Sequence, residues 1–245
     1  MTKVLQSDDP KANYLLAALS EEEITRLSAV LQPVSLKLGM VLYESGEQLQ
    51  DVYFPTTAIV SLLYIMENGS TAEIGITGND GVVGIALFMG GHTTPNRAVV
   101  QSGGTGYRLS SRALKAEFDQ AGIFQKLLLL YTQALMTQIS QTAVCNRLHP
   151  IEKQLCRWLL INQDLLQHNE LIMTHELIAN MLGVRREGVS IAAGDLQKKG
   201  LIKYVRGTMT MLDRAGLEAE VCECYEVVRN EYDRLLGPYV SKFRQ

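Results

Sequence analysis

The chain has 245 residues, of which 47% are hydrophobic and 20% are charged, and its net charge is −3. This length allows one large domain or two modest ones, and the high apolar content excludes a mainly disordered chain. No apolar stretch is long enough to span a bilayer, and the acidic start does not resemble a signal peptide. We therefore expect a soluble, cytoplasmic protein without a membrane partner.

The cysteines are sparse. Cys145, Cys156, Cys222 and Cys224 are too few for a disulfide framework, which fits a reducing compartment. Only Cys222 and Cys224 are close in sequence, and no Cys or His pair stands at the spacing typical of a zinc site. We expect these two thiols to lie on a terminal helix, and we predict no metal site.

The first half of the chain reads as one helix followed by short strands. Ser20 and the three glutamates after it predict a capped helix, which Pro33 ends. Glycine turns then separate β-branched runs, and Asn68-Gly69 between two of these runs predicts a hairpin. The runs cover residues 40–43, 52–54, 58–65, 71–76, 82–88, 98–101 and 106–109. Many short strands at regular spacing predict a small β-roll or barrel.

From residue 111 the period becomes helical, with a short helix over 111–120 and a long one over 123–148. The long helix, ~40 Å at ~1.5 Å per residue, carries a stripe with the four-and-three spacing of a coiled-coil seam. The stripe consists of Phe124, Leu128, Tyr131 and Leu135, continued by Gln138, Thr142 and Cys145. It suits either the core of the β domain or a dimer. We favour a dimer, because a helix between two domains with a spare apolar stripe needs a partner.

His149-Pro150 marks a boundary, after which a helix is predicted over 151–167. Thr174 is placed to cap a short helix, and Gly183 supplies a tight turn before a second helix over 185–199. The predicted buried face of the first helix is Leu177, Ile178, Met181 and Leu182, and that of the second is Val189, Ala192, Ala193 and Leu196. Two short helices joined across a glycine form a helix-turn-helix, whose second helix enters the DNA major groove.

The exposed face of the second helix carries chemistry suited to DNA. Arg185 and Arg186 in its first turn oppose the helix dipole, which an anionic partner would offset. Arginine can bind guanine as a fork, Glu187 can accept from cytosine, and Ile191 can pack on a thymine methyl. Two strands around Arg206-Gly207 then predict a wing with a basic tip, and a single helix over 215–236 closes the domain.

Charge supports the same assignment. Residues 171–214 contain seven basic and four acidic side chains, a balance of +3 in a chain that is negative overall. The alternative is a three-helix scaffold with solvated charges. The capped helix, glycine turn, paired arginines and basic wing together favour DNA binding.

Nearly the whole chain resembles the Crp/Fnr family of bacterial transcription regulators, most sharply from Thr174 to Ser190 and over the following LQKKGLIKYVRG. The resemblance implies an α+β fold, with a cyclic-nucleotide-binding-like jelly roll (1–122), a dimerisation helix (123–148), a winged helix-turn-helix (149–236) and a tail (237–245). Such regulators are homodimers on palindromic double-stranded DNA operators, and many contact RNA polymerase.

The resemblance also implies a set of DNA-binding residues. Arg186 and Glu187 take the positions of the base readers, Arg185 lies near phosphate, and Ile191 stands where better-known members carry arginine. The operator should therefore depart from their consensus. The full implied set is Thr174, His175, Arg185, Arg186, Glu187, Ser190, Ile191, Lys198 and Arg206.

The sensor half departs from the family pattern. Cyclic-nucleotide binders carry a Gly-Glu pair and then Arg-Ser/Thr-Ala, whereas this chain has Gly84-Ile85 and later Asn96-Arg97-Ala98. Isoleucine cannot accept a hydrogen bond from ribose, so a cAMP-like ligand at Gly84, Ile85, Asn96 and Arg97 is disfavoured and the effector is unknown. No amino-terminal cysteine cluster suggests an iron–sulfur centre, and the lone His92 of the β domain does not suggest haem. We expect no cofactor.

Two other classes of function fit the sequence less well. A cupin-type enzyme needs several converging histidines, and the chain has no phosphate loop, nucleophile elbow or His-Glu-x-x-His. A winged helix that mediates protein contacts, or a ligand-binding protein without sequence-specific DNA binding, is the other alternative. We predict a DNA-binding regulator and not an enzyme.

Overall fold

The computed structural model describes residues 9–166 and 168–241. They form two compact units. The first comprises residues up to 62, Ile76–Met136 and those from Glu231 onward, and the second comprises Leu63–Gly75 and Thr137–Asn230. None of the helices within the described ranges is long and apolar enough to cross a membrane.

The first unit begins with the short helices η1 (Pro10–Ala12) and α1 (Tyr14–Ala17), followed by α2 (Glu21–Ser28). Ser20 Oγ accepts from the Glu23 N–H at 3.2 Å, and the Glu23 carboxylate accepts from the Ser20 N–H at 3.2 Å. This capping box confirms the predicted start of α2. The helix ends at Ser28, before the expected stop at Pro33.

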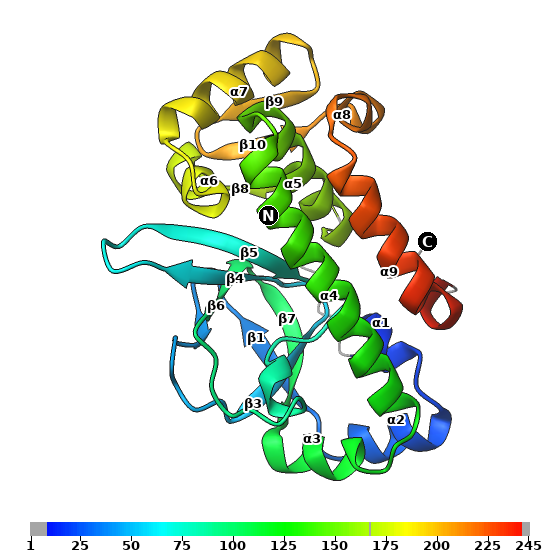
Figure 1. Cartoon of the computed structure of the whole chain (residues 1–245). Helices are drawn as coiled ribbons and strands as arrows, with labels where there is room; N and C mark the ends of the chain where they lie inside the picture. Colours follow the sequence, from blue (N-terminus) through cyan, green and yellow to red (C-terminus); the bar gives the residue numbers. More distant parts are fainter. Residues whose placement is uncertain (1–8, 167, 242–245) are drawn as a thin grey trace. The chain divides into compact units, whose positions relative to one another are not determined.

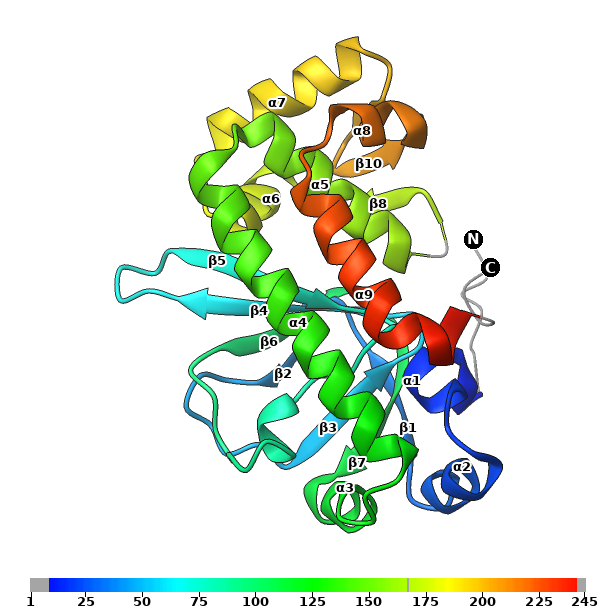
Figure 2. The same ribbon diagram turned by 45° about the vertical axis from the view of Figure 1, so that its right-hand side comes forward.

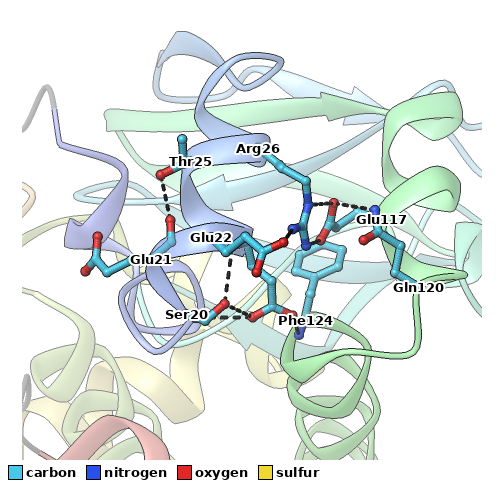
Figure 3. Close-up of polar contacts among 9 residues, drawn as sticks. Ser20, Glu21, Glu22, Thr25, Arg26, Glu117, Gln120 and Phe124 are labelled. Atoms are coloured by element: carbon cyan, nitrogen blue, oxygen red, sulfur yellow. Dashed lines mark hydrogen bonds and ion pairs between the residues drawn. The ribbon is translucent and has the colours of Figure 1, made fainter.

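The same region ties α2 to α3 (Ser111–Phe118) and α4 (Ile123–Leu148), as Figures 2 and 3 show. The Arg26 guanidinium donates to both oxygens of Glu117, at 2.7 and 3.2 Å. Glu23 accepts from the Phe124 N–H at 3.1 Å, which satisfies one of the unpaired donors at the start of α4. The base of the long helix is thus held by charged groups of its own unit.

Seven strands form two sheets that correspond to the predicted β-roll (Figure 1). The sheet orders are β1-β7-β3 and β2-β6-β4-β5. The strands are β1 (Gln32–Leu36), β2 (Val41–Tyr43), β3 (Asp51–Pro55), β4 (Ile59–Ile65), β5 (Thr71–Thr77), β6 (Arg97–Ser102) and β7 (Gly104–Ser110). The Asn68-Gly69 hairpin is confirmed, with Gly69 at φ +83° and Met66 N–H bonded to Ser70 O.

Two strand assignments from the sequence fail. Residues 82–88 are not a strand, because Gly84 turns the backbone at φ +101° and caps the 3₁₀ helix η2 (Ile85–Leu87). Strand β1 was not predicted, since Pro33 reads as a breaker. β1 is an edge strand that pairs only with β7, and there the missing N–H of proline is tolerated.

The stripe on α4 is buried, but within the chain itself. Phe124, Leu128, Tyr131 and Leu135 are each at most 2% exposed. The Phe124 ring lies 6.3 Å from that of Phe54, and the Tyr131 hydroxyl lies 2.9 Å from Thr77 Oγ1. The prediction that these four residues form a dimer seam is therefore wrong. Periodicity identifies a buried face but does not identify the surface that buries it.

The second unit contains the winged helix-turn-helix (Figures 1 and 2). Its sheet has the antiparallel order β8-β10-β9, and β8 was not predicted. The elements are α5 (Ile151–Leu165), β8 (Glu170–Ile172), α6 (His175–Leu182), α7 (Arg186–Lys198), β9 (Ile202–Val205), β10 (Thr208–Met211), α8 (Arg214–Glu220) and the start of α9 (Cys224–Val240).

The carboxy-terminal helix is interrupted. The single helix expected over 215–236 is wrong, because α8 ends at Glu220, Val221 is extended (ψ 161°) and α9 restarts at Cys224. No proline or glycine lies between them to signal the break. α9 continues to Val240, so the tail expected at 237–245 begins inside a helix, and residues 242–245 lie outside the described ranges.

The tip of the β4–β5 hairpin belongs to the second unit. The Trp158 indole donates to Glu73 Oε1 at 2.9 Å, and both side chains are buried. Thr71 Oγ1 donates to the Asn180 carbonyl of α6 at 3.5 Å. A buried hydrogen bond therefore joins the hairpin to α5, whereas its contact with α6 is exposed.

Candidate nucleic-acid interface

The two short helices meet as predicted. Thr174 Oγ1 accepts from the Leu177 N–H at 3.2 Å and caps α6. Gly183 ends α6 in the left-handed region at φ +66°, a conformation that favours glycine. α7 begins at Arg186 with Arg185 as its N-cap, one residue later than expected.

One side of α7 packs against α5 and α6. The predicted buried face of α7 is confirmed, because Val189, Ala192, Ala193 and Leu196 are all buried. Small alanines at the centre of this face let the neighbouring helices approach closely. On α6 the prediction of a buried Leu177 is wrong, since that side chain is 45% exposed. Ala179, which was not predicted to be buried, is buried.

The other side of α7 is open to solvent. Arg185, Arg186 and Glu187 are exposed, and Ile191 is 66% exposed. Within the described parts of the chain, no carboxylate pairs with either arginine. Two free guanidinium groups at a helix N-terminus are unfavourable next to the positive end of the dipole, and an anion bound there would relieve this.

The implied contact Lys198 lies at the far end of α7 and is engaged inside the chain. Its ammonium lies 2.9 Å from Asp195 Oδ1 one turn earlier. This ion pair is exposed, so it holds the side chain only weakly. Lys198 therefore differs from the two arginines in having a carboxylate partner, but its ammonium stays available for an outer contact.

The wing is a tight hairpin with a basic tip. Arg206 and Gly207 join β9 to β10 with φ values of +49° and +84°. Two successive left-handed residues define the type I′ turn, which matches the twist of a hairpin. The Met173 N–H donates to the Gly207 carbonyl at 2.8 Å, so the wing is fixed to the residue before the α6 cap. Arg206 is exposed at the tip.

His175 connects α6, α7 and the wing. Its ring stacks on Tyr204 of β9 with centroids 4.1 Å apart, and its Nδ1 lies 3.0 Å from Ser190 Oγ of α7. Half-buried in this way, His175 orients Ser190 within the unit rather than pointing away from it. Burial, and then the charge of Arg186, lower the pKa of His175.

This environment predicts a pH dependence of stability. A histidine whose pKa is lower in the folded than in the unfolded state contributes stability above the unfolded pKa, about 6.5, and loses it as the pH falls. We expect the free energy of unfolding to drop between about pH 7.5 and about pH 5.5, and His175→Gln to weaken this drop. Denaturant titrations at both pH values measure it.

All four predicted effector residues belong to the first unit, and two of them, Asn96 and Arg97, have hydrogen-bond partners inside the chain. The Arg97 guanidinium donates to both oxygens of Glu44, at 2.8 and 2.5 Å, and Asn96 Oδ1 accepts from the Tyr43 hydroxyl at 3.1 Å. The Arg97 hydrogen bond lowers the pKa of Glu44. An anion bound at Arg97 would have to displace this carboxylate, a partner that sequence analysis missed because it lies 53 residues away.

Sequence analysis also missed a group of potential metal ligands in the second unit. Cys145, His149, Cys222 and Cys224 converge there, with their ligand atoms all within 4.8 Å of one another. The expectation that Cys222 and Cys224 both lie on a terminal helix holds for Cys224, the first residue of α9, whereas Cys222 lies in the break before that helix. The spacing Cys-x₃-His at 145–149 was the available signal, but nothing in the sequence shows which distant residues join it.

This architecture is similar to that of known proteins. Residues 153–220 match the family model of the Crp-like helix-turn-helix domain. No curated protein matches the sequence.

Solved structures share the fold. One is a Crp/Fnr-family transcriptional regulator from Eubacterium rectale, with a TM-score of 0.66 and 18% identity over 87% of this chain and 99% of that one. FixK2 from Bradyrhizobium japonicum has a TM-score of 0.66 and 17% identity over 79% and 98%. A Crp-family regulator from Thermus thermophilus has a TM-score of 0.65 and 19% identity over 76% and 95%. The predicted fold class and resemblance are confirmed.

Proposed function

This chain carries a Crp-like helix-turn-helix domain on the fold of Crp/Fnr transcription regulators, and we propose that it binds a palindromic operator as a homodimer. The observation that carries the proposal is the start of α7. Arg185 and Arg186 are exposed there without a carboxylate partner in the described residues, while the opposite face of the helix is buried. That arrangement presents a basic helix end to the major groove.

The resemblance to the Crp/Fnr family assigns the roles of the residues on α7. Arg186 and Glu187 read base edges, and Arg185, at the N-cap, binds phosphate. The exposed Ile191 contacts a thymine methyl, so the operator differs from one read by arginine at this place. Ser190 adds a hydroxyl contact to the duplex, and its hydrogen bond with His175 sets the direction of that hydroxyl. Thr174, Lys198 and Arg206 supply outer contacts to the backbone of the duplex.

The homodimer forms through the exposed face of α4. On this face Leu129 is 50% and Met136 is 60% exposed. Gln133, whose side chain donates to Glu231 of α9 at 3.5 Å, lies between them, and Ser140 and Ala143 continue the four-and-three spacing of a two-helix seam. A second copy of the chain is the occupant, because a palindrome requires two recognition helices related by a twofold axis.

The sensor half does not bind a standard cyclic nucleotide in this proposal. Ile85 offers no acceptor to a ribose, and Arg97 is held by Glu44. The effector is a different ligand or is absent, and contact with RNA polymerase follows from the resemblance alone.

The alternative is a winged helix that binds proteins. Gel-shift assays against genomic fragments over a salt series distinguish the two functions. A DNA-binding protein that neutralises several phosphates loses affinity steeply with salt, because bound counterions are released. Failure to retain any duplex at low ionic strength would contradict the proposal and favour the alternative.

The wing provides a separate prediction. Arg206→Ala should weaken binding to all duplexes about equally and reduce the slope of log K against log salt by about one, because a phosphate contact carries no sequence information. Alanine keeps the Cβ, so the left-handed backbone at this position is equally strained in both proteins. Titrations on specific and scrambled duplexes provide the measurement. A loss confined to the specific duplex would show instead that Arg206 reads a base.

A further inference from the structure

Three thiols and one imidazole meet in the second unit, away from α7 and the wing. Cys145 Sγ lies 3.6 Å from Cys222 Sγ, and Cys224 Sγ lies 3.6 Å from His149 Nδ1. All three cysteines are unoxidised and at most 5% exposed. The sequence alone does not reveal this group, because Cys145 and Cys222 are 77 residues apart.

The separations match a single coordination sphere. With Zn–S of about 2.3 Å and Zn–N of about 2.0 Å, the edges of a tetrahedron measure roughly 3.5–3.8 Å. The Cys145–Cys222 and Cys224–His149 separations, both 3.6 Å, fall in this interval, and no two ligand atoms of the group are more than 4.8 Å apart. A multi-iron cluster spreads its thiolates over several irons, so a group this tight favours one ion.

Two features of the fold build the group. Cys145 and His149 are one helical turn apart at the end of α4, and the His149 N–H still donates to the Cys145 carbonyl at 3.0 Å. Cys222 lies in the break between α8 and α9, and Cys224 is the first residue of α9. Coordination of an ion by these two cysteines would account for the break, which contains no proline or glycine.

Neighbouring groups hydrogen-bond to the four ligand residues and orient them. His149 Nε2, on the far side of the ring from Cys224, lies 3.5 Å from Glu223 Oε2, the arrangement of a carboxylate–histidine–metal triad. The Cys224 N–H donates to the Cys222 sulfur. Gln154 of α5 donates to the His149 carbonyl at 2.8 Å and so fixes the chain just after α4.

A buried arginine supplies positive charge near the thiols. Arg157 of α5 is 3% exposed, donates to Thr142 Oγ1 at 3.2 Å, and has an Nε atom with no partner among the described residues. Three thiolates and a neutral imidazole around a divalent ion carry a net charge of −1, which a buried guanidinium near Cys145 would balance.

We propose that Cys145, His149, Cys222 and Cys224 bind one tetrahedral, thiolate-preferring metal ion, with Zn²⁺ as its type. Four protein ligands leave no open position, so the ion is structural rather than catalytic. It joins the end of α4 to the start of α9 and releases the thiol protons on binding. This inference goes beyond DNA binding and is tested without DNA.

The test is Co²⁺ titration of the reduced full-length protein under anaerobic conditions. We expect about one equivalent to bind with the absorption of tetrahedral thiolate Co²⁺, and Zn²⁺ to displace it. Cys224→Ser and His149→Gln should each lower affinity at least about tenfold. Glu223→Gln, at an exposed residue that contributes nothing to the core, should lower it less while the fold is preserved.

Cys156→Ser is the matched control, because Cys156 is equally buried on α5 but outside the group. Cys156→Ser should bind Co²⁺ as the natural chain does. The proposal is overturned if the reduced natural chain takes up no Co²⁺, if the ligand variants bind normally, or if Cys156→Ser loses binding equally. A Cys145–Cys222 disulfide in the purified protein, with no Co²⁺ uptake after reduction, would likewise overturn it.

Discussion

Arg186→Ala is expected to lower affinity for the selected operator by about 1–3 kcal/mol and to relax the preference at one base pair. The guanidinium is exposed at the first position of α7 and has no carboxylate partner within the described ranges, so its removal leaves no buried charge unpaired. The loss therefore reports on the contact with DNA and not on folding. Operators selected from a random duplex pool, followed by anisotropy titrations, give the affinity for each base at each position.

Two comparisons make this result interpretable. Arg229→Ala removes an exposed arginine from α9 and should leave the affinity unchanged. Arg185→Ala, at the N-cap, should weaken specific and scrambled duplexes alike, since a phosphate contact carries no sequence preference. If Arg186→Ala leaves both the affinity and the selected sequence unaltered, α7 is not the recognition helix.

The sequence predicts local features of this interface well and long-range pairings poorly. The α7 face and the Gly183 turn depend on spacing within one or two helices, and both are as expected. Leu177 was misplaced because the buried face of α6 is centred on Ile178, Ala179, Met181 and Leu182, which turns Leu177 toward solvent. The pairing of Arg97 with Glu44 depends on a contact across 53 residues.

The Cys/His group illustrates the same limit. Each pair of ligands is local, Cys-x₃-His in one place and Cys-x-Cys in the other, and each alone is too common to indicate a metal. Only the tertiary fold brings the pairs together, at the break between α8 and α9. That break was itself unpredictable, because the sequence there lacks the residues that usually end a helix.

The long helix shows a further ambiguity, with a consequence for the dimer. α4 has two four-and-three stripes, and the more apolar one lies in the core of its own unit. The inner stripe is the more hydrophobic of the two, because a folded core excludes water more completely than a dimer seam does. The dimer is therefore proposed on the second stripe, which contains the exposed Leu129 and Met136.

The double variant Leu129→Glu, Met136→Glu is expected to be a folded monomer. Carboxylates at the centre of a two-helix seam would face their own copies across the twofold axis, and neither their repulsion nor their desolvation would be offset. A monomer engages one half-site only, so operator affinity should fall about a thousandfold or more. Sedimentation measures the mass, circular dichroism the fold, and anisotropy the affinity.

The inner stripe provides the contrasting variant. Leu128→Glu places a charge at a fully buried position, so we expect it to cost about 4 kcal/mol or more and to unfold the first unit. Met89→Glu, at another exposed methionine of that unit, should remain a folded dimer. If the double variant stays dimeric, the seam lies elsewhere. If Leu128→Glu yields a folded monomer, the inner stripe contacts a partner after all, and the assignment of the two faces of α4 must be reversed.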